Sequence, residues 1–286
     1  MQSKSLKKMI FNSQMNFFME AHDPISAMIV ENNGFEAIWL SSLSLSTCQG
    51  LRDLNEICMS EVLNVANRIV EKVDIPILVD VDSGYGNFNN FRIAATRLEK
   101  LGIAGVCIED KKYPKSNSFF NYGQELSSIS EMCGKIKAAR DKLSNNDFVI
   151  VARLESFIVG ESKDQALERA EKYIDAGADA VLIHSKLNVP DEVFSFSKCW
   201  NNKSPIFAVP TTYYKTSALD FKTNNINNII WANHNIRASI KAMNDICSEI
   251  RNKNSISTIE NKITSINEIF QNLNYDELKV DENKYL

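Results

Sequence analysis

Residues 75–109 read IPILVDVDSGYGNFNNFRIAATRLEKLGIAGVCIE and contain the unit from which the fold is built. The apolar run at residues 77–82 predicts a buried strand, because parallel strands that are covered on both faces are apolar along their length. An amphipathic helix is expected at residues 87–101, with Gly102 as its end, and another strand at residues 105–109. The stretch therefore predicts a strand, a helix and a parallel strand in succession.

The same unit repeats along the chain. We expect eight strands, at residues 17–21, 37–41, 77–82, 105–109, 148–154, 180–184, 205–209 and 228–232. Helices are expected at residues 24–33, 55–72, 87–101, 131–143, 162–177 and 191–200, with a short or irregular helix at 212–227 and a last helix after residue 232. Such a repeat predicts an α/β fold, a (β/α)8 barrel of TIM type over residues 1–254, with a doubly wound sheet as the alternative.

Residues 255–286 fall outside this repeat. Apolar residues recur there at helical spacing, at positions 256, 259, 263, 266, 270 and 273. An apolar stripe on a helix has to be buried, and the barrel itself or a partner subunit would serve equally well as its cover. We therefore expect an extra C-terminal helical segment, an extension and tail at residues 255–286.

The composition is that of an ordinary globular protein. The chain has 286 residues, of which 44% are hydrophobic and 24% charged, and its net charge is −4. A basic surface for nucleic acid is therefore not expected, and no apolar run reaches the roughly 18 residues of a membrane span. The six cysteines are scattered without a C-x-x-C pair, which indicates the reduced thiols of a cytoplasmic protein.

The predicted strands end in polar residues, which is where barrel enzymes place their chemistry. These residues are Ser41, Ser42, Asp80, Asp82, Glu109, Asp110, Arg153, His184, Thr211, Thr212 and Asn233. Asp80 and Asp82 point to the same side of their strand, and Glu109 comes from the next strand. Gathered carboxylates repel one another unless a cation neutralises them, and oxygen ligands favour a hard ion. We therefore expect these three residues to form a Mg²⁺ site, with capped turns or surface salt bridges as the alternative.

Arg153 and His184 end two further strands. A guanidinium at the end of a buried strand needs an anionic partner, because an unpaired buried charge is costly. We expect Arg153 to bind a substrate carboxylate or phosphate through its planar fork, in preference to an ion pair with Glu155 or Glu109. His184 by itself would be taken for a satisfied core histidine, but in this ring of strand ends we expect it to contact the substrate.

Two strings carry a family resemblance. In VDVDSGYGN (79–87) and EDKKYPKSNS (109–118) the chain resembles the isocitrate lyase/phosphoenolpyruvate mutase superfamily, and in particular its phosphoenolpyruvate mutases. The resemblance runs from about Phe17 to Arg237 and includes EAHDPISAMIVENNGFEAIW (20–39), RDLNE (52–56), VARLES (151–156) and ANHNIRA (232–238). It implies a Mg²⁺-dependent isomerase that interconverts phosphoenolpyruvate and phosphonopyruvate by intramolecular phosphoryl transfer, for phosphonate biosynthesis. It also implies a homodimer or homotetramer with an exchanged eighth helix.

The resemblance further implies roles for individual residues. Asp80 would bind Mg²⁺ directly, while Asp82, Glu109 and Asp53 would hold metal-bound waters. The substrate would be bound by Ser41, Arg153, His184 and the backbone N–H groups of Ser42 and Leu43. The segment Lys111–Phe120 would be a gating loop that closes over the substrate. The catalytic residues would be Asn117, Lys115, Ser118, Arg153 and Asp53, with Asn117 as either a covalent phosphoryl acceptor or a guide.

The loop also separates the chain from other members of the superfamily. The carbon–carbon lyases carry a catalytic Cys in a K-[KR]-C-G-H loop, and the equivalent loop here has no Cys, Gly or His. Phosphonopyruvate hydrolases resemble the mutases but usually have Thr at the position of Asn117. The mutases usually have Gly at the position of Ser42, so a side chain there would narrow the approach of an anion to the backbone. The alternatives to a mutase are a hydrolase that releases pyruvate and phosphate, a lyase or decarboxylase of a 2-oxo acid, and a barrel that binds without turnover.

Overall fold

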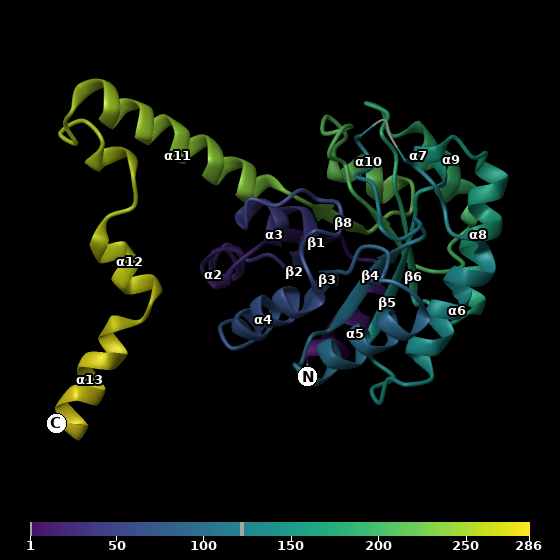
Figure 1. Ribbon diagram of the computed structural model, residues 1–286, viewed down its shortest axis with the longest axis horizontal. Coiled ribbons are helices and arrows are strands. Elements are labelled where there is room, and N and C mark those ends of the chain that lie inside the picture. Colours follow the sequence, from purple (N-terminus) through teal and green to yellow (C-terminus); the bar gives the residue numbers. More distant parts are fainter. Residues whose placement is uncertain (1, 121–122) are drawn as a thin grey trace. The chain divides into compact units, whose positions relative to one another are not determined.

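A computed structural model describes residues 2–120 and 123–286, and its strands close into a parallel barrel (Figure 1). The strands are β1 (Asn16–Ala21), β2 (Ala37–Leu40), β3 (Ile77–Asp80), β4 (Gly105–Glu109), β5 (Val149–Leu154), β6 (Ala180–Ile183), β7 (Ile206–Ala208) and β8 (Asn228–Trp231). Each strand pairs with the next, and β8 pairs with β1. Phe18 accordingly lies opposite Ala37 on one side and Ile230 on the other. The predicted (β/α)8 barrel is confirmed.

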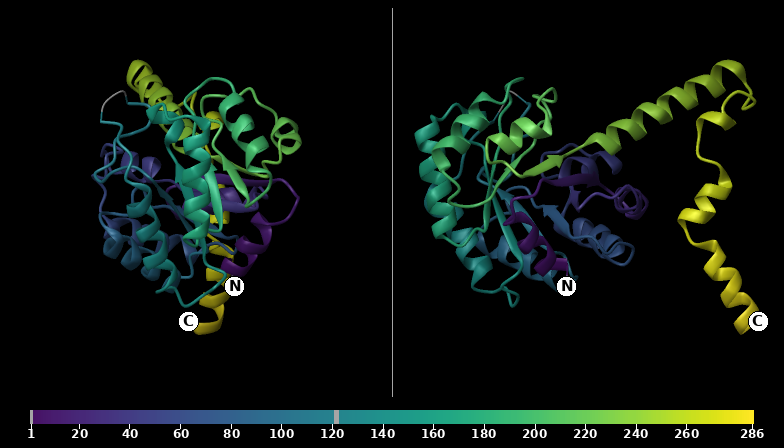
Figure 2. Two further views of the ribbon diagram at one scale, coloured as in Figure 1. Left: turned by 90° about the vertical axis from the view of Figure 1, so that its right-hand side faces the viewer. Right: turned by 180° about the vertical axis from the view of Figure 1, so that it is seen from behind.

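Helices surround the barrel (Figure 2). They are α2 (Pro24–Asn32), α4 (Met59–Val70), α5 (Phe88–Lys100), α6 (Ile129–Arg140), α8 (Lys163–Asp175), α9 (Asp191–Trp200) and the short α10 (Ala218–Thr223), and α11 (His234–Lys253) follows β8. Most begin at polar caps; Asp23, for example, accepts a hydrogen bond from Ser26 N at the start of α2. The expected start of α4 at residue 55 was wrong, because Asn55 has a φ of 59° and the helix begins after Cys58.

Three helices were not expected from the sequence: α1 (Gln2–Ile10), α3 (Ser42–Cys48) and α7 (Ser156–Val159). Leu6 and Ile10 of α1 are buried among the side chains that fill the barrel. Leu6 also lies over Gly105, at the beginning of β4, where an added Cβ would come within 3.2 Å of its Cδ2 atom. The helix α1 therefore closes the amino-terminal end of the barrel, and the carboxyl ends of the strands are left for the site.

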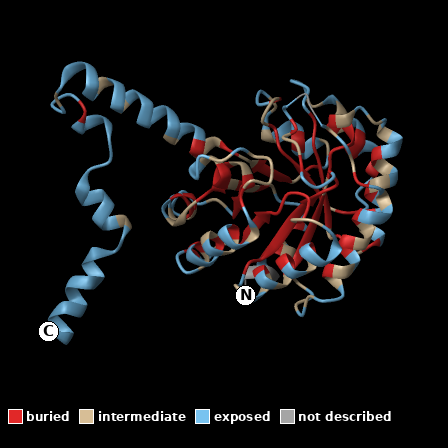
Figure 3. Ribbon diagram, in the orientation of Figure 1, coloured by how far each residue is buried: buried red, intermediate tan, exposed pale blue. Residues whose placement is uncertain are grey.

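The core has two layers. One fills the barrel interior, and the other lies between the strands and the surrounding helices, where for example Val62, Ala66 and Ile69 of α4 are buried. Figure 3 shows the strands buried and the outer faces of these helices exposed. The six cysteines are all unbridged. In the described part of the chain, no helix is both long and apolar enough for a transmembrane span.

The chain forms two compact units, the first ending at Ile236 and the second running Arg237–Leu286. The second unit contains most of α11, followed by η1 (Glu260–Lys262), α12 (Ile266–Asn272) and α13 (Tyr275–Tyr285). Residues 237–286 are all described, and among them Ile259 alone is buried. The apolar residues at positions 256–273 thus lie in several short helices and turns and not in one continuous helix. The expected boundary between a catalytic barrel domain and a C-terminal extension at residue 254 stays a prediction.

Candidate active site

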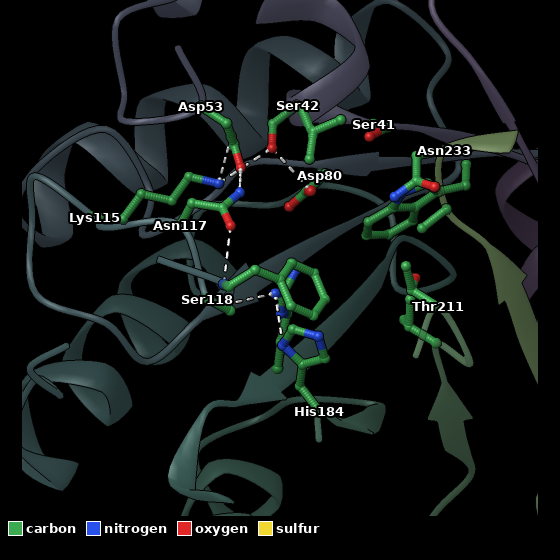
Figure 4. A pocket seen from close by; sticks show the side chains of 16 residues that line it. Ser41, Ser42, Asp53, Asp80, Lys115, Asn117, Ser118, His184, Thr211 and Asn233 are labelled. Carbon is green, nitrogen blue, oxygen red and sulfur yellow. Dashed lines mark hydrogen bonds and ion pairs between the residues drawn. The ribbon is translucent and has the colours of Figure 1, made fainter. Parts of the chain in front are cut away.

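A pocket of about 50 Å³ lies at the carboxyl ends of the barrel strands (Figure 4). It is lined by Trp39, Ser41, Ser42, Leu43, Asp53, Asp80, Lys115, Asn117, Ser118, Phe119, Arg153, His184, Val209, Thr211, Ala232 and Asn233. The residues predicted to be catalytic or to bind substrate are all in this set, together with Asp80. Asp82 and Glu109 are buried and are linked to it through Lys115 and Arg153. The structure thus brings the predicted residues together, while their roles stay predictions.

Two carboxylates, Asp53 and Asp80, line the pocket, and two more, Asp82 and Glu109, are buried beside it. Asp80 ends β3 and Asp82 follows it, Glu109 ends β4, and Asp53 lies in the segment after α3. The Lys115 ammonium lies between two of them, with Nζ 2.7 Å from Asp53 Oδ1 and 2.6 Å from Asp82 Oδ1. A cation from the loop therefore lies within a cluster of acids from the barrel.

Burial makes two of these acids, Asp80 and Glu109, harder to ionise. It raises the pKa of Asp80 to about 6, and the neighbouring charge of Asp82 adds to the effect. Burial likewise raises the pKa of Glu109 to about 7, although Lys115 and Arg153 oppose the shift. A divalent cation bound between these two carboxyl groups would favour their ionised forms and so offset the effect of burial.

The donor set fits a hydrated divalent metal. Glu109 Oε1 is buried and has no hydrogen-bond partner among the described residues, which is costly unless a water or an ion is bound there. Within residues 2–120 and 123–286, no three Asp, Glu, His or Cys side chains lie close enough to ligate one ion directly. The roles of Asp80, Asp82 and Glu109 at a metal therefore stay predictions. A hard cation that retains several waters suits such a site.

The loop at residues 111–120, called the gating loop here after its predicted role, is held against the barrel. Asn117 Nδ2 donates to Asp53 Oδ2 at 2.6 Å, and the backbone N–H of Lys115 donates to Asn55 Oδ1 at 2.6 Å. Gln124 also holds the loop backbone in place, because its Nε2 donates to Asn117 O and Phe120 O, at 2.7 Å in each case. The loop therefore carries Lys115 and Asn117 to the acid cluster, as Figure 4 shows.

His184 lies across the pocket from Asp53 and Asp80 (Figure 4), and Arg153 lines the same pocket. The ion pair that the sequence analysis disfavoured is present, because Arg153 Nε donates to Glu155 Oε1 at 2.5 Å and lies 3.6 Å from Glu109 Oε2. His184 is also partnered, with Nδ1 2.8 Å from Glu155 Oε1. Both side chains nevertheless line the pocket. Each of them therefore contacts Glu155 and is also open to a substrate in the pocket.

Glu155 is the residue that the sequence reasoning undervalued. It is fully buried and lies two positions after Arg153, whose Nε donates to its Oε1. Burial alone would raise its pKa, but the charges of Arg153 and His184 hold the pKa of Glu155 well below its usual range. The spacing of the two residues in VARLES was the signal that could have identified it.

The start of α3 forms another part of the wall. Ser41 Oγ caps this helix by accepting a hydrogen bond from Ser44 N at 3.3 Å. The N–H groups of Ser42 and Leu43 belong to the first turn, where a helix supplies no acceptor. The Ser42 hydroxyl donates to Asp80 Oδ2 at 3.0 Å, so the side chain that replaces the usual Gly is tied to the acid cluster.

Comparison with known proteins gives a consistent result. A family model described as phosphoenolpyruvate phosphomutase matches residues 6–251. A phosphoenolpyruvate phosphomutase from Tetrahymena pyriformis is 46% identical over 282 residues, which cover 98% of this chain and 94% of the relative. The crystal structure of phosphoenolpyruvate phosphomutase from Streptomyces platensis subsp. rosaceus has a TM-score of 0.97 at 38% identity and covers 100% of this chain and 99% of that one. A phosphonopyruvate hydrolase in complex with oxalate and Mg²⁺ has a TM-score of 0.93 at 33% identity, with 99% of each chain covered.

Proposed function

The chain belongs to the phosphoenolpyruvate phosphomutase family, and we propose that it interconverts phosphoenolpyruvate and phosphonopyruvate with Mg²⁺ as its cofactor. The observation that carries this proposal is the meeting of three groups in one pocket. These are the acid cluster around Asp80, the side chains of Arg153 and His184, and the loop residues Lys115 and Asn117. The reaction is an isomerisation, so it needs a site that holds both fragments of one substrate.

The acid cluster would hold the metal. Asp80 would be its direct ligand, and Asp82, Glu109 and Asp53 would bind its waters. When bound, Mg²⁺ would stabilise negative charge on the enolate oxygen of pyruvate, which is the usual contribution of a Lewis acid. The Mg²⁺ in the related hydrolase structure supports this choice of ion.

The opposite wall would hold the pyruvate part. Arg153 uses Nε and Nη2 for Glu155, Ser118 and His184, so Nη1 would be its contribution to the substrate carboxylate. The first-turn N–H groups of Ser42 and Leu43 would donate to the same anion. These contacts would fix the plane of the enolate, so that its oxygen and its carbon 3 both face the migrating phosphoryl group.

The gating loop would guide that group. In the forward direction the P–O bond of phosphoenolpyruvate breaks and a P–C bond forms at carbon 3, and no atom is gained or lost. The phosphoryl group in transit is metaphosphate-like and negatively charged. Lys115 would neutralise it, and the Asn117 amide would direct it from oxygen to carbon. Because the loop covers the pocket, water would be kept from capturing it.

The test is a phosphorus NMR assay of phosphonopyruvate with the purified protein, with and without Mg²⁺. Formation of phosphoenolpyruvate in the presence of the metal supports the proposal. Release of inorganic phosphate would identify a hydrolase instead, and unchanged phosphonopyruvate would indicate a barrel without turnover. The loop without Cys argues against a carbon–carbon lyase.

We further propose a homodimer or homotetramer in which the eighth helix of the barrel, α11, is exchanged between subunits. The helix has apolar side chains that are exposed in a single chain, among them Ile240, Met243 and Ile250. Such residues need a cover, and a second copy of the chain would provide it. Analytical ultracentrifugation should give a dimer or tetramer that Met243→Glu dissociates. A wild-type monomer at micromolar concentration would contradict this.

A further inference from the structure

The carboxylate of Glu155 joins two parts of the site. Its Oε1 accepts from Arg153 Nε at 2.5 Å and lies 2.8 Å from His184 Nδ1. Its Oε2 accepts from Ser118 Oγ at 2.6 Å and lies 3.3 Å from Lys111 Nζ. The first pair belongs to the barrel strands and the second to the gating loop. One buried group therefore contacts both the anion-binding wall and the lid.

We propose that Glu155 is a positioning residue that latches the gating loop in its closed state and couples closure to the alignment of Arg153 and His184. The inference rests on the proposed function, because it gives the loop and the anion-binding wall the roles described above. Glu155 does not line the pocket, so it acts through the residues that do.

The hydroxyl of Ser118 uses all of its hydrogen bonds in the contact between the gating loop and Glu155. It donates its one proton to Glu155 Oε2, and it accepts from Lys111 Nζ at 2.7 Å and from Arg153 Nη2 at 3.4 Å. A hydroxyl has one donor and two acceptor sites, so Ser118 has no further hydrogen bond to give. In the closed state its hydroxyl therefore holds the loop, whereas Lys115 and Asn117 remain for the phosphoryl group.

A buried ion pair between Lys111 and Glu155 favours the closed loop. The Lys111 side chain is only 2% exposed and that of Glu155 is fully buried. Lys111 also donates to Ser116 O at 2.7 Å, which ties its ammonium to the loop backbone. If the loop opens, the buried carboxylate loses the Ser118 and Lys111 contacts together, and separating buried partners is costly. The closed state is therefore favoured when Glu155 is ionised and in place.

Glu155 itself is anchored independently of the loop. Its backbone N–H donates to Asp110 Oδ1 at 2.9 Å, and Tyr173 OH donates to the other oxygen of Asp110 at 2.9 Å. A change in Ser118 therefore leaves the position of Glu155 intact. The loop side of the latch can be tested without disturbing the barrel.

The experiment measures chymotrypsin cleavage at Phe119 and Phe120, which are exposed on the gating loop. The full-length protein is digested with and without saturating Mg²⁺ and oxalate, and the ratio of the two rates gives the protection of the loop. We expect Glu155→Gln and Ser118→Ala to reduce this protection about tenfold, the loss typical of a hydrogen bond to a charged group. Ser118→Thr retains the hydroxyl and should restore the protection.

Glu125→Gln is the matched control, since the Glu125 carboxylate forms an exposed pair with Lys112, at 2.7 Å. Such a pair contributes little, so protection should stay at the wild-type level. The double variant Glu155→Gln/Ser118→Ala should lose no more protection than Glu155→Gln alone, because Ser118 acts through its bond to the Glu155 carboxylate. Additive losses, or latch variants that behave like the control, would overturn the inference.

Product analysis separates this inference from the proposed function. A loose lid admits water, so the latch variants should convert a larger fraction of phosphonopyruvate to inorganic phosphate than the wild type does. An unchanged product ratio together with unchanged protection would remove Glu155 from this role. Since protection is measured without turnover, a wild type that forms no phosphoenolpyruvate would defeat the proposed function alone.

Discussion

Lys115 Nζ lies 2.6 Å from Asp82 Oδ1, so a cation from the gating loop contacts an acid that follows β3. Both side chains are almost completely buried. The same ammonium opposes the rise in the pKa values of Asp80 and Glu109. The loop is therefore an electrostatic part of the acid cluster as well as its cover. Losing this cation should change how the protein responds to metal.

Lys115→Met should lower the melting temperature in a chelating buffer, because Asp53 and Asp82 would lose a buried partner. Added Mg²⁺ should raise the melting temperature of this variant more than that of the wild type, since it then supplies the missing charge. Lys112→Met, which removes an exposed partner of Glu125, is the control and should melt like the wild type. Equal melting of all three proteins without metal would contradict the expectation.

Asp80→Ala should abolish turnover, because it removes the predicted direct ligand of the metal. We expect a loss of at least about 100-fold, as for other groups that stabilise transition-state charge. The phosphorus NMR assay measures it, and binding of Mn²⁺ followed by electron paramagnetic resonance should weaken in parallel. The exposed Asp74, just before the same strand, is the matched position, and Asp74→Ala should keep both properties. Full activity of the Asp80 variant would refute the metal assignment.

Asn117→Ala should remove mutase activity and leave the fold intact. Its amide contacts Asp53 Oδ2 and the N–H of Phe119, both near the loop, so the barrel core is unaffected. We expect a loss of about 10²–10³-fold with a near-native melting curve. Asn64→Ala, at an exposed position on α4, should change neither quantity. Wild-type rates in the Asn117 variant would show that another group guides the phosphoryl transfer.

The barrel could be predicted from the sequence because its strands are short apolar runs that end in polar residues. The helix α3 could not, since its sequence, SLSLSTC, is rich in Ser, which is a weak helix former. It forms because Ser41 caps it and because Ser44 and Leu45 are buried. In the site, strand-end positions pointed to Asp80, Asp82, Glu109, Arg153 and His184, whereas Asp53 was implied only by the family resemblance. The Lys111–Glu155 contact could not be predicted, because it depends on the path of the loop in space.

Leu6→Ala tests the unexpected helix α1. Leu6 is fully buried at the closed end of the barrel, so truncation should leave a cavity and cost about 2–5 kcal/mol of the free energy of unfolding. Phe11→Ala is the control, because Phe11 is 56% exposed, and it should change stability by less than about 0.5 kcal/mol. Chemical denaturation gives both values. Equal stability of the two variants would mean that α1 does not contribute to the barrel core.

His22, which is not one of the residues that line the pocket, provides a pH-dependent contribution to stability. Burial opposes its protonation, but the hydrogen bond to Glu20, with Nδ1 2.6 Å from Oε1, outweighs this and raises the pKa of His22 above 6.5. A pKa raised by folding stabilises the protein below the unfolded value, and this stabilisation is lost as the pH rises through the folded value. His22→Gln retains a hydrogen bond to Glu20 but does not titrate. The wild type should therefore melt higher than this variant at pH values below 6.5, and the difference should shrink as the pH is raised above 6.5. Melting curves across this range provide the measurement, and a difference that stays constant or grows with pH would show that the His22–Glu20 pair does not stabilise the fold in this way.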